Sequence, residues 1–467
     1  MSSLESFSPF TFNEDQKIAA GLLENFINDP VDRVLILTGH AGTGKTSMIQ
    51  ALIRYAQDKK HPVVLLASTG RAAKVVAEKA GYSSETVHKH IYTLQADETD
   101  DDKKMKKLVF KLRANTSPET AVYIVDESSM ISDHKTESVF IKFGTGKLLS
   151  DLFLYAGNKK VIFVGDPAQL PPINTLFPPS LNRQYIRENH RKTVAMASLE
   201  QIMRHGHDSG ISYNNVQLRK AIAVNNQVYL KLKATGFNDI KLYFNLDSLV
   251  SGYVSNISEY GLDENIFITY SNALANEVNL KVRALLFPGK KVIRKNELLM
   301  VVMNNYKFDI SNGEQIVIDW IDSRAEHRAG LNFRDFTGQV KDVNGYRAVS
   351  GKLMEDLLYT RTPFLSNEQE WGLYKDFMVR LHQKGIDAKH PEFLSELISD
   401  PWLNAIRARF GYAVTCHKAQ GGEWERAFVV FEPSLFMQDK VYQHRWAYTA
   451  ISRGMKELHL LDNRCIF

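Results

Sequence analysis

Cysteine is nearly absent from this chain of 467 residues, which contains only Cys416 and Cys465. Two cysteines cannot build a disulfide framework or a zinc site of four cysteine ligands, so both are excluded. Long apolar runs are missing too, since none approaches the roughly eighteen residues that span a bilayer. The first residues lack the basic and apolar segments of a secretory signal peptide. The sequence therefore predicts a cytoplasmic protein with no membrane segment.

Charge of one sign does not dominate either. The formal net charge is +5 and the isoelectric point is near 8.8, which permits a polyanionic partner without demanding one. The apolar fraction of 44% and the charged fraction of 24% are those of a globular protein. The length allows two to four domains, and the sequence has no repeat of fixed period.

Short apolar runs alternate with helical patterns, which is typical of parallel sheets with crossover helices. Four runs in the first half end in small or acidic residues, as buried strands do when their carboxyl ends carry a site. These runs cover residues 33–39, 62–68, 121–127 and 160–166. Two similar runs, at 265–272 and 426–432, predict a second α/β unit.

Two stretches interrupt this alternation. Residues 91–112 contain two strand-like pieces around a charged tip, which predicts a hairpin or a solvated surface loop. Residues 313–400 begin with two strand patterns and continue with a helix pattern that has a capping box at Ser366 and Gln369. The apolar stripe of that helix is expected to pack into the core; it consists of Trp371, Tyr374, Phe377 and Leu381.

The segment GHAGTGKT at 39–46 follows an apolar strand and matches a phosphate-binding loop. Its glycines let backbone N–H groups turn inward around phosphates. Lys45 is expected to reach the β- and γ-phosphates, and the Thr46 hydroxyl to bind Mg²⁺. The sequence therefore predicts a nucleotide site at this strand end.

Acidic and amide side chains follow two further strands. Asp126 and Glu127 end the third strand, where an aspartate suits Mg²⁺ and a glutamate can polarise the attacking water. In GDPAQLPP, Gln169 is a candidate sensor of the γ-phosphate and Asp166 is expected to hold the turn. A structural proline-rich loop remains the alternative for this last segment.

These motifs, in this order, resemble those of superfamily 1 helicases. The resemblance extends over almost the whole chain, and the TVHK and HKAQG segments are similar to the RecD/Dda-like branch, superfamily 1B. The further matching segments are FTFNEDQ (10–16), LASTGRAAK (66–74), ETVHK (85–89), LEQIMRHG (199–206), YSNALANEVN (270–279), GYAVTCHKAQGGEW (411–424) and AYTAISRGMKEL (447–458).

The resemblance implies an α/β fold with two RecA-like parallel-sheet domains. It implies a first domain at 1–195 with a pin-like insertion at about 91–118, in which Tyr92 or Phe110 offers an aromatic contact to DNA. The second domain is expected at 196–312 and 401–467, interrupted by a β-rich, SH3-like accessory insertion at 313–400.

The resemblance also implies the site residues. Gln16 would read adenine, with an exposed glutamine at a helix start as the alternative. Arg204 and Arg453 would reach the γ-phosphate, with a surface ion pair as the alternative, chiefly for Arg204. The implied catalytic residues are Lys45, Glu127, Gln169, Arg204 and Arg453. The implied nucleotide contacts are Gln16, Gly39, Ala41, Gly42, Thr43, Gly44, Lys45, Thr46, Ser47, Gln420 and Gly421, with Thr46 and Asp126 as metal ligands.

The implied DNA contacts come from strand ends and hydroxyl groups, which position a strand without reading its sequence. They are Ser68, Thr69, Arg71, Thr86, His88, Thr415 and His417. A core histidine is the alternative for His88. For the adjacent Cys416 and His417, strand alternation predicts a buried cysteine with Thr415 and His417 facing DNA, not a catalytic pair.

The expected function is an ATP-dependent 5′→3′ DNA helicase that uses ATP and Mg²⁺. Its partners would be single-stranded DNA and single-strand/duplex junctions, and it would act as a monomer of bacterial or phage origin. One alternative is a translocase that displaces proteins without unwinding duplex. Another is a nucleic-acid-binding subunit of a nuclease assembly whose ATPase is vestigial, although the complete set of motif residues argues against decay.

Overall fold

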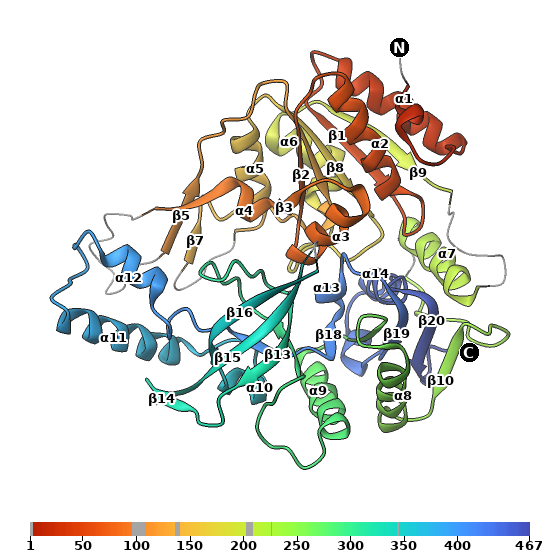
Figure 1. Cartoon of the computed structure of the whole chain (residues 1–467). Coiled ribbons are helices and arrows are strands. Elements are labelled where there is room, and N and C mark those ends of the chain that lie inside the picture. The colour runs from red at the N-terminus through yellow and green to blue at the C-terminus, as the bar shows by residue number, and fades with distance from the viewer. Residues whose placement is uncertain (1–2, 96–107, 136–140, 202–208, 226, 343–344) are drawn as a thin grey trace. The chain divides into compact units, whose positions relative to one another are not determined.

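The computed structural model describes residues 3–95, 108–135, 141–201, 209–225, 227–342 and 345–467. The chain forms two compact units (Figure 1). Unit 1 comprises Met1–Ser212, Val216–Asn225 and His444–Thr449, and unit 2 comprises Tyr213–Asn215, Asn226–Gln443 and Ala450–Phe467. Within the described ranges, no helix combines the length and the apolar character that crossing a membrane requires.

Unit 1 is built on a six-stranded sheet in the order β3-β2-β6-β8-β1-β9, and every pairing in it is parallel. Its strands are β1 (Val34–Gly39), β2 (Val63–Ala67), β3 (Ser84–Thr86), β6 (Val122–Asp126), β8 (Lys160–Gly165) and β9 (Val194–Leu199). The four apolar runs of the first half form β1, β2, β6 and β8, so the predicted parallel sheet is confirmed.

Helices cover both faces of this sheet (Figure 1). Alternate strand residues enter different cores: Leu35 and Leu37 of β1 join one apolar cluster, whereas Val34 and Ile36 join the other. This explains why the strands are apolar along their whole length. The helices of unit 1 are α1 (Glu14–Asn28), α2 (Lys45–Asp58), α3 (Gly70–Ala80), α4 (Val87–Ile91), α5 (Leu148–Ala156), α6 (Arg183–His190) and α7 (Gly210–Ala223).

The predicted hairpin exists. Strands β4 (Tyr92–Gln95) and β5 (Leu108–Leu112) pair antiparallel, and β7 (Ile141–Phe143) joins β5 in parallel. Its charged tip, 96–107, lies outside the described residues. The expectation that Tyr92 or Phe110 offers an aromatic contact is wrong for both rings. They are buried against Phe143 at centroid distances of 5.2 and 4.8 Å, and the Tyr92 hydroxyl donates to Asp151.

Unit 2 contains a second parallel sheet, in the order β10-β20-β19-β11-β18. Its strands are β10 (Ile240–Tyr243), β11 (Asn265–Thr269), β18 (Ala413–Thr415), β19 (Trp424–Val429) and β20 (Gly454–Leu461). Helices α8 (Leu246–Tyr260) and α9 (Asn272–Leu286) pack beside it, and the short α13 (Cys416–Ala419) follows β18. The prediction of two RecA-like parallel sheets is therefore confirmed.

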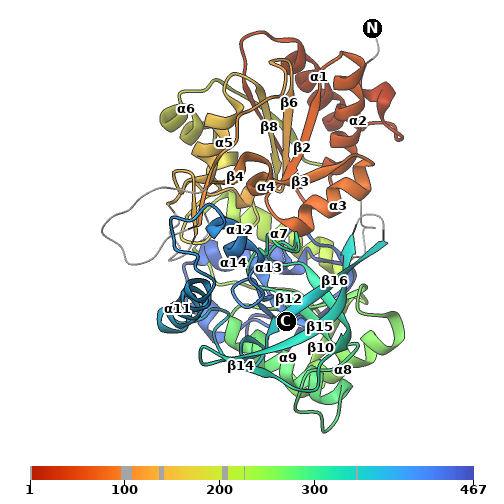
Figure 2. The same cartoon turned by 60° about the vertical axis from the view of Figure 1, so that its left-hand side comes forward.

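An antiparallel sheet completes unit 2, with β15 and β16 forming a long ribbon (Figure 2). Its strands are β12 (Leu298–Val301), β13 (Gln315–Ile321), β14 (Glu326–Arg328), β15 (Leu331–Asp342), β16 (Gly345–Met354) and β17 (Ala408–Phe410). Strands β12 and β17 come from chain on either side of 313–400, so the sheet is wider than the predicted insertion.

Three helices lie between β16 and β17: α10 (Asp356–Tyr359), α11 (Asn367–Gln383) and α12 (Phe393–Ser399). The capping box of Ser366 and Gln369 at the start of α11 is confirmed. Tyr374, Phe377 and Leu381 of the predicted stripe are buried, whereas Trp371 is only half-buried.

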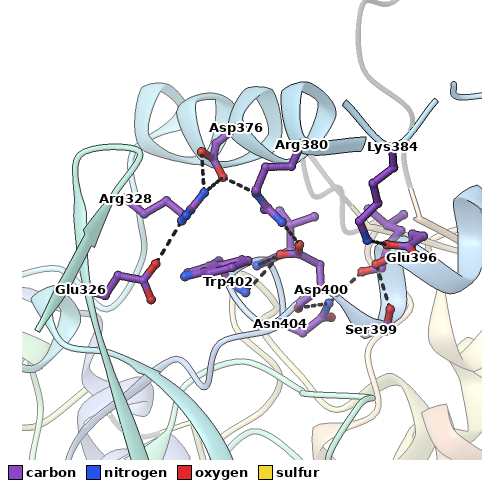
Figure 3. A network of polar contacts seen from close by, with 12 residues as sticks. Glu326, Arg328, Asp376, Arg380, Lys384, Glu396, Ser399, Asp400, Trp402 and Asn404 are labelled. Carbon is purple, nitrogen blue, oxygen red and sulfur yellow. Dashed lines mark hydrogen bonds and ion pairs between the residues drawn. The ribbon is translucent and has the colours of Figure 1, made fainter. Parts of the chain in front are cut away.

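A polar network attaches α11 to the antiparallel sheet (Figure 3). We call it the Trp402 network, after the indole at its centre. The guanidinium carbons of Arg328 and Arg380 lie 4.1 and 4.4 Å from the Trp402 ring centroid. Asp376 accepts hydrogen bonds from both arginines, and Arg380 also pairs with Asp400. Asp400 in turn accepts the backbone N–H of Trp402 at 3.1 Å.

Candidate nucleotide site

The phosphate-binding loop lies between the carboxyl end of β1 and the first turn of α2. Gly42 and Gly44 have φ of +82° and +88°, a region that favours glycine. A Cβ on Gly39 would approach the Thr43 hydroxyl oxygen to 2.7 Å. The Lys45 ammonium donates to the carbonyl oxygens of Gly39 at 2.8 Å and His40 at 2.9 Å. The loop carbonyl oxygens thus bind the ammonium group of Lys45. The loop leads into a fourteen-residue helix, and the free N–H groups at the start of that helix favour anions.

Gln16 lies against this loop. Its side-chain nitrogen donates to the Thr43 carbonyl at 3.2 Å, and its side-chain oxygen accepts the Asn13 N–H at 3.1 Å in a capping box. The residue is buried, so the alternative of an exposed glutamine at a helix start is wrong. The adenine-reading role of Gln16 stays a prediction, and its amide groups bond within the chain in this structure.

Asp126 and Glu127 stand at the carboxyl end of β6. Burial and the neighbouring charge of Glu127 raise the pKa of Asp126 to about 7. Glu127 adopts φ +48° and ψ +37°, an uncommon left-handed conformation for a residue with a side chain. Its Oε2 atom is buried with no hydrogen-bond partner among the described residues. Burying two adjacent carboxylates and holding Glu127 in a left-handed backbone conformation both lower the stability of the protein. Such unfavourable arrangements are typical of a functional site.

The carboxylate of Asp126 and the hydroxyl of Thr46 suit Mg²⁺, which prefers oxygen ligands and binds through few protein groups plus phosphate. The buried carboxylate oxygen of Glu127, directly after Asp126 and without a partner among the described residues, also fits a site that receives a cation and a water. No group of three or more His, Cys, Asp or Glu that could hold a metal occurs in the described part of the chain. The Thr46 hydroxyl and the Asp126 and Glu127 carboxylates therefore fit a magnesium–nucleotide complex.

The GDPAQLPP segment follows β8. Asp166 is fully buried and accepts the Ala168 N–H at 3.0 Å, so it holds the turn as expected. Burial alone would raise the pKa of Asp166, but hydrogen bonding to His40 and the charge of Lys45 lower it to about 2. Gln169 is buried, and its Oε1 atom has no hydrogen-bond partner among the described residues. Its backbone is fixed while its side-chain oxygen remains available.

The DNA-contact candidates of unit 1 lie at the ends of β2 and β3. The Thr69 hydroxyl caps α3, the Thr86 hydroxyl caps α4, and the buried Ser68 hydroxyl has no partner in the described residues. The ring of His88 packs 5.3 Å from Phe143, and burial lowers the pKa of His88 to about 4. This packing supports the alternative of a core histidine. Arg71 lies in the first turn of α3.

In unit 2, Arg453 precedes β20 and is buried. Its guanidinium donates to the Gly422 carbonyl and to the Ser452 hydroxyl, both at 3.0 Å. The structure thus brings Arg453 beside the segment that contains Gln420 and Gly421, within the same unit. Arg204 lies outside the described residues.

Cys416 is buried as predicted, but the predicted reason is wrong. Strand β18 ends at Thr415 and Cys416 begins α13, so strand alternation does not orient Cys416 and His417. Burial raises the pKa of the Cys416 thiol and lowers that of His417 to about 4. A protonated thiol beside a neutral imidazole is not an activated nucleophile.

Three residues that contact the phosphate-binding loop or the turn after β8 were not singled out from the sequence: His40, Arg445 and Tyr448. His40 occupies a variable position of the phosphate-loop pattern, and Arg445 and Tyr448 precede the arginine of the last motif. The one available signal is that Arg445, Tyr448 and Thr449 share a helix face.

A phosphate-binding loop, an Asp-Glu pair at a strand end and two parallel sheets define a P-loop NTPase with RecA-like domains. Residues 11–226 match the model of the AAA domain, and residues 410–461 match that of the UvrD-like helicase C-terminal domain. Both matches are consistent with a superfamily 1B helicase of the Pif1/RecD-like branch, which supports the resemblance found from the motifs.

Relatives support this assignment. The ATP-dependent DNA helicase Pif1 of Psychrobacter is 27% identical over 92% of this chain and 66% of its own length. The ATP-dependent RecD2 DNA helicase of Deinococcus radiodurans is 30% identical over 31% of this chain and 17% of its own length. An uncharacterized protein of Methanocaldococcus jannaschii is 23% identical over 96% of this chain and 38% of its own length. The chain thus spans less than two thirds of each of these three relatives.

Proposed function

We propose that this protein is an ATP-dependent DNA helicase that moves 5′→3′ on single-stranded DNA and unwinds duplex. The observation that carries the proposal is Glu127, whose strained backbone presents a buried, unpartnered carboxylate oxygen directly after Asp126. A glutamate at this position suits transfer of phosphate to water, because it can accept the proton of an attacking water. The Pif1 and RecD2 relatives are named as DNA helicases, which supports the same class.

In the proposed reaction, water attacks the γ-phosphorus of ATP, its proton passes to Glu127, and ADP and phosphate leave. Lys45 stabilises the charge that develops on the phosphates, and Gln169 orients the γ-phosphate or the water. Thr46 and Asp126 would hold magnesium, which would neutralise phosphate charge when bound. Arg453 and Arg204 contribute further positive charge, and Gln16 releases Thr43 to contact adenine.

We further propose that the first RecA-like domain covers 1–195 with its insertion at about 91–118, and that the second covers 196–312 and 401–467 around the accessory insertion at 313–400. Ser68, Thr69, Arg71, Thr86, His88, Thr415 and His417 contact the DNA strand, and Gln420 and Gly421 the nucleotide. His88 is the weakest member of this set, because its ring packs on Phe143. We propose that a monomer suffices for the activity.

The decisive experiment measures strand displacement on duplexes that carry either a 5′ or a 3′ single-stranded tail, with ATP and Mg²⁺. Unwinding of the 5′-tailed duplex is expected, and a preference for the 3′-tailed duplex would contradict the polarity. ATPase activity is measured in parallel with and without single-stranded DNA. Strong stimulation without unwinding would point to a protein-displacing translocase, and DNA binding without any ATPase to a binding subunit. Lys45→Ala serves as the inactive control.

A further inference from the structure

Helix α14 (Lys440–Ile451) carries three polar side chains on one face: Arg445, Tyr448 and Thr449. They are spaced i, i+3 and i+4, the spacing of neighbours on a helix surface. Residues His444–Thr449 belong to unit 1, as do the phosphate-binding loop and the segment after β8. We call these three residues the α14 triplet. Each of them forms hydrogen bonds with one or both of those segments.

Tyr448 bonds with both segments at once. Its hydroxyl donates to Asp166 Oδ2 at 2.6 Å and accepts the Ala41 N–H at 3.3 Å. The ring nitrogen Nδ1 of His40 lies 3.2 Å from the other oxygen of Asp166. Tyr448 and Asp166 are both buried. One phenol therefore links the first turn of the phosphate-binding loop to the turn after β8.

Arg445 and Thr449 bond with the backbone on either side of the Gln169 side chain. The Arg445 guanidinium donates to the carbonyl oxygens of Pro167 and, at 3.1 Å, of Gln169 itself. The Thr449 hydroxyl accepts the Leu170 N–H at 2.9 Å and donates to the Arg445 carbonyl at 2.7 Å. Helix α14 thus fixes the peptide group that follows Gln169 on both its carbonyl and its N–H side, and also binds the Pro167 carbonyl two residues before Gln169.

The charge states strengthen the central bond. Asp166 is ionised at neutral pH, because hydrogen bonding and Lys45 hold its pKa at about 2 despite burial. Burial and the Asp166 charge raise the pKa of Tyr448 well above its usual value, so its hydroxyl keeps its proton. A phenol that donates to a buried carboxylate makes a short, charge-assisted hydrogen bond, which suits a group that must hold its neighbours in place.

We propose that the α14 triplet positions the nucleotide-hydrolysing groups: Tyr448 sets the first turn of the phosphate-binding loop, while Arg445 and Thr449 set Gln169. These are positioning residues, because they act through Asp166, Ala41 and the backbone of Gln169. The proposal rests on the proposed ATPase function. It assigns to Arg445, Tyr448 and Thr449 a part in catalysis separate from that of Arg453 in the same motif.

A purely structural role for Tyr448 is the competing explanation, and unit 1 contains a matched control for it. The Tyr185 hydroxyl donates to Asp133 at 2.8 Å, another tyrosine–aspartate bond in the same unit. Asp133 also accepts a hydrogen bond from the Ser150 hydroxyl and lies 3.1 Å from His190, none of which is a site candidate. Tyr185→Phe therefore removes the same kind of bond away from the nucleotide residues.

The experiment compares Tyr448→Phe with Tyr185→Phe in the full chain. Both are expected to lower the melting temperature to a similar extent. Only Tyr448→Phe is expected to lower kcat of the DNA-stimulated ATPase, by about ten- to hundredfold, with a smaller change in KM, because small misplacements of reacting groups cost rate. It should also weaken binding of ADP with aluminium fluoride relative to ADP alone, whereas Tyr185→Phe should not.

An unchanged kcat and an unchanged ratio of the two affinities in Tyr448→Phe would overturn the positioning role. If Tyr448→Phe does not fold, Thr449→Val decides, since it removes the acceptor of the Leu170 N–H and keeps the side-chain volume. A wild-type protein without ATPase would refute the proposed function instead. In that case the affinity ratio still tests the α14 triplet, because it needs no turnover.

Discussion

Two clusters of charged residues in this protein differ in whether their carboxylates are paired with cations. At the nucleotide site, Asp126 and Glu127 are adjacent carboxylates; burial raises the pKa of one, and the other has a strained backbone and an unpartnered oxygen. In the Trp402 network, Asp376 and Asp400 are instead paired with arginines that stack on an indole. The first arrangement costs stability and suits chemistry, whereas the second satisfies its own charges and suits assembly.

The largest expected effect tests the first half of this contrast. Glu127→Gln keeps the shape of the side chain and removes its ability to accept a proton. We expect kcat of the ATPase to fall by about 10²–10⁴-fold, the usual contribution of a general base. ADP binding and DNA binding should be retained, as measured by fluorescence titration. Hydrolysis at the wild-type rate would show that Glu127 is not the base.

A second prediction concerns stability and its pH dependence. The pKa of Asp126 is raised to about 7 in the folded, nucleotide-free protein. Below about pH 4 the carboxyl is protonated in both the folded and the unfolded state and costs no stability. As the pH rises from about 4 through 7, the unfolded state loses its proton first, so the free energy of unfolding falls. Asp126→Asn cannot ionise. It should therefore be more stable than the wild type at pH 8, by about 2–4 kcal/mol, since each pKa unit corresponds to about 1.4 kcal/mol.

Denaturant unfolding at pH 5 and pH 8 measures this difference. The advantage of Asp126→Asn should shrink at the lower pH. A difference that is the same at both pH values, or a variant less stable than the wild type at pH 8, would contradict the cost assigned to Asp126.

The third prediction concerns a carboxylate whose removal should lower the stability of the protein instead of raising it. Asp400→Asn removes the negative charge that pairs with Arg380 and accepts the backbone N–H of Trp402. It should destabilise the protein by about 1.5–3 kcal/mol, the range of a hydrogen bond to a charged group. ATPase per folded molecule should not change. Lys384→Ala is the control, since this lysine is 57% exposed and pairs with Glu396 at the rim of the same helices. Its effect should stay within about 0.5 kcal/mol. Equal losses in the two variants would remove the distinction between the network and its rim.

Local sequence patterns predicted the parts of the fold that depend on neighbouring residues. The strand runs, the phosphate-binding loop and the capping box of Ser366 and Gln369 are all short-range, and each is present. The orientation of Cys416 was assigned wrongly because a single residue decides whether β18 continues or α13 begins.

Features that depend on distant parts of the chain escaped prediction. Tyr92 and Phe110 are buried because β7, some thirty residues beyond β5, brings Phe143 against them. Tyr448 meets Asp166 across 282 residues of sequence, and Arg445 binds backbone carbonyl oxygens, which no side-chain pattern reports. Every residue has a backbone carbonyl, so the side chain at the accepting position does not reveal such a hydrogen bond.

The α10–α12 segment begins and ends at one point of the antiparallel sheet of unit 2. The chain leaves the sheet after Met354 and returns at Ile406. Leu353 and Ile406 form a β-bridge, and the Met354 N–H donates to the Ile406 carbonyl at 3.0 Å. The two ends of the intervening segment therefore start from one place. Asp376 of α11 joins the segment to Arg328 of β14 a second time, so these helices are held both at their base and through the Trp402 network.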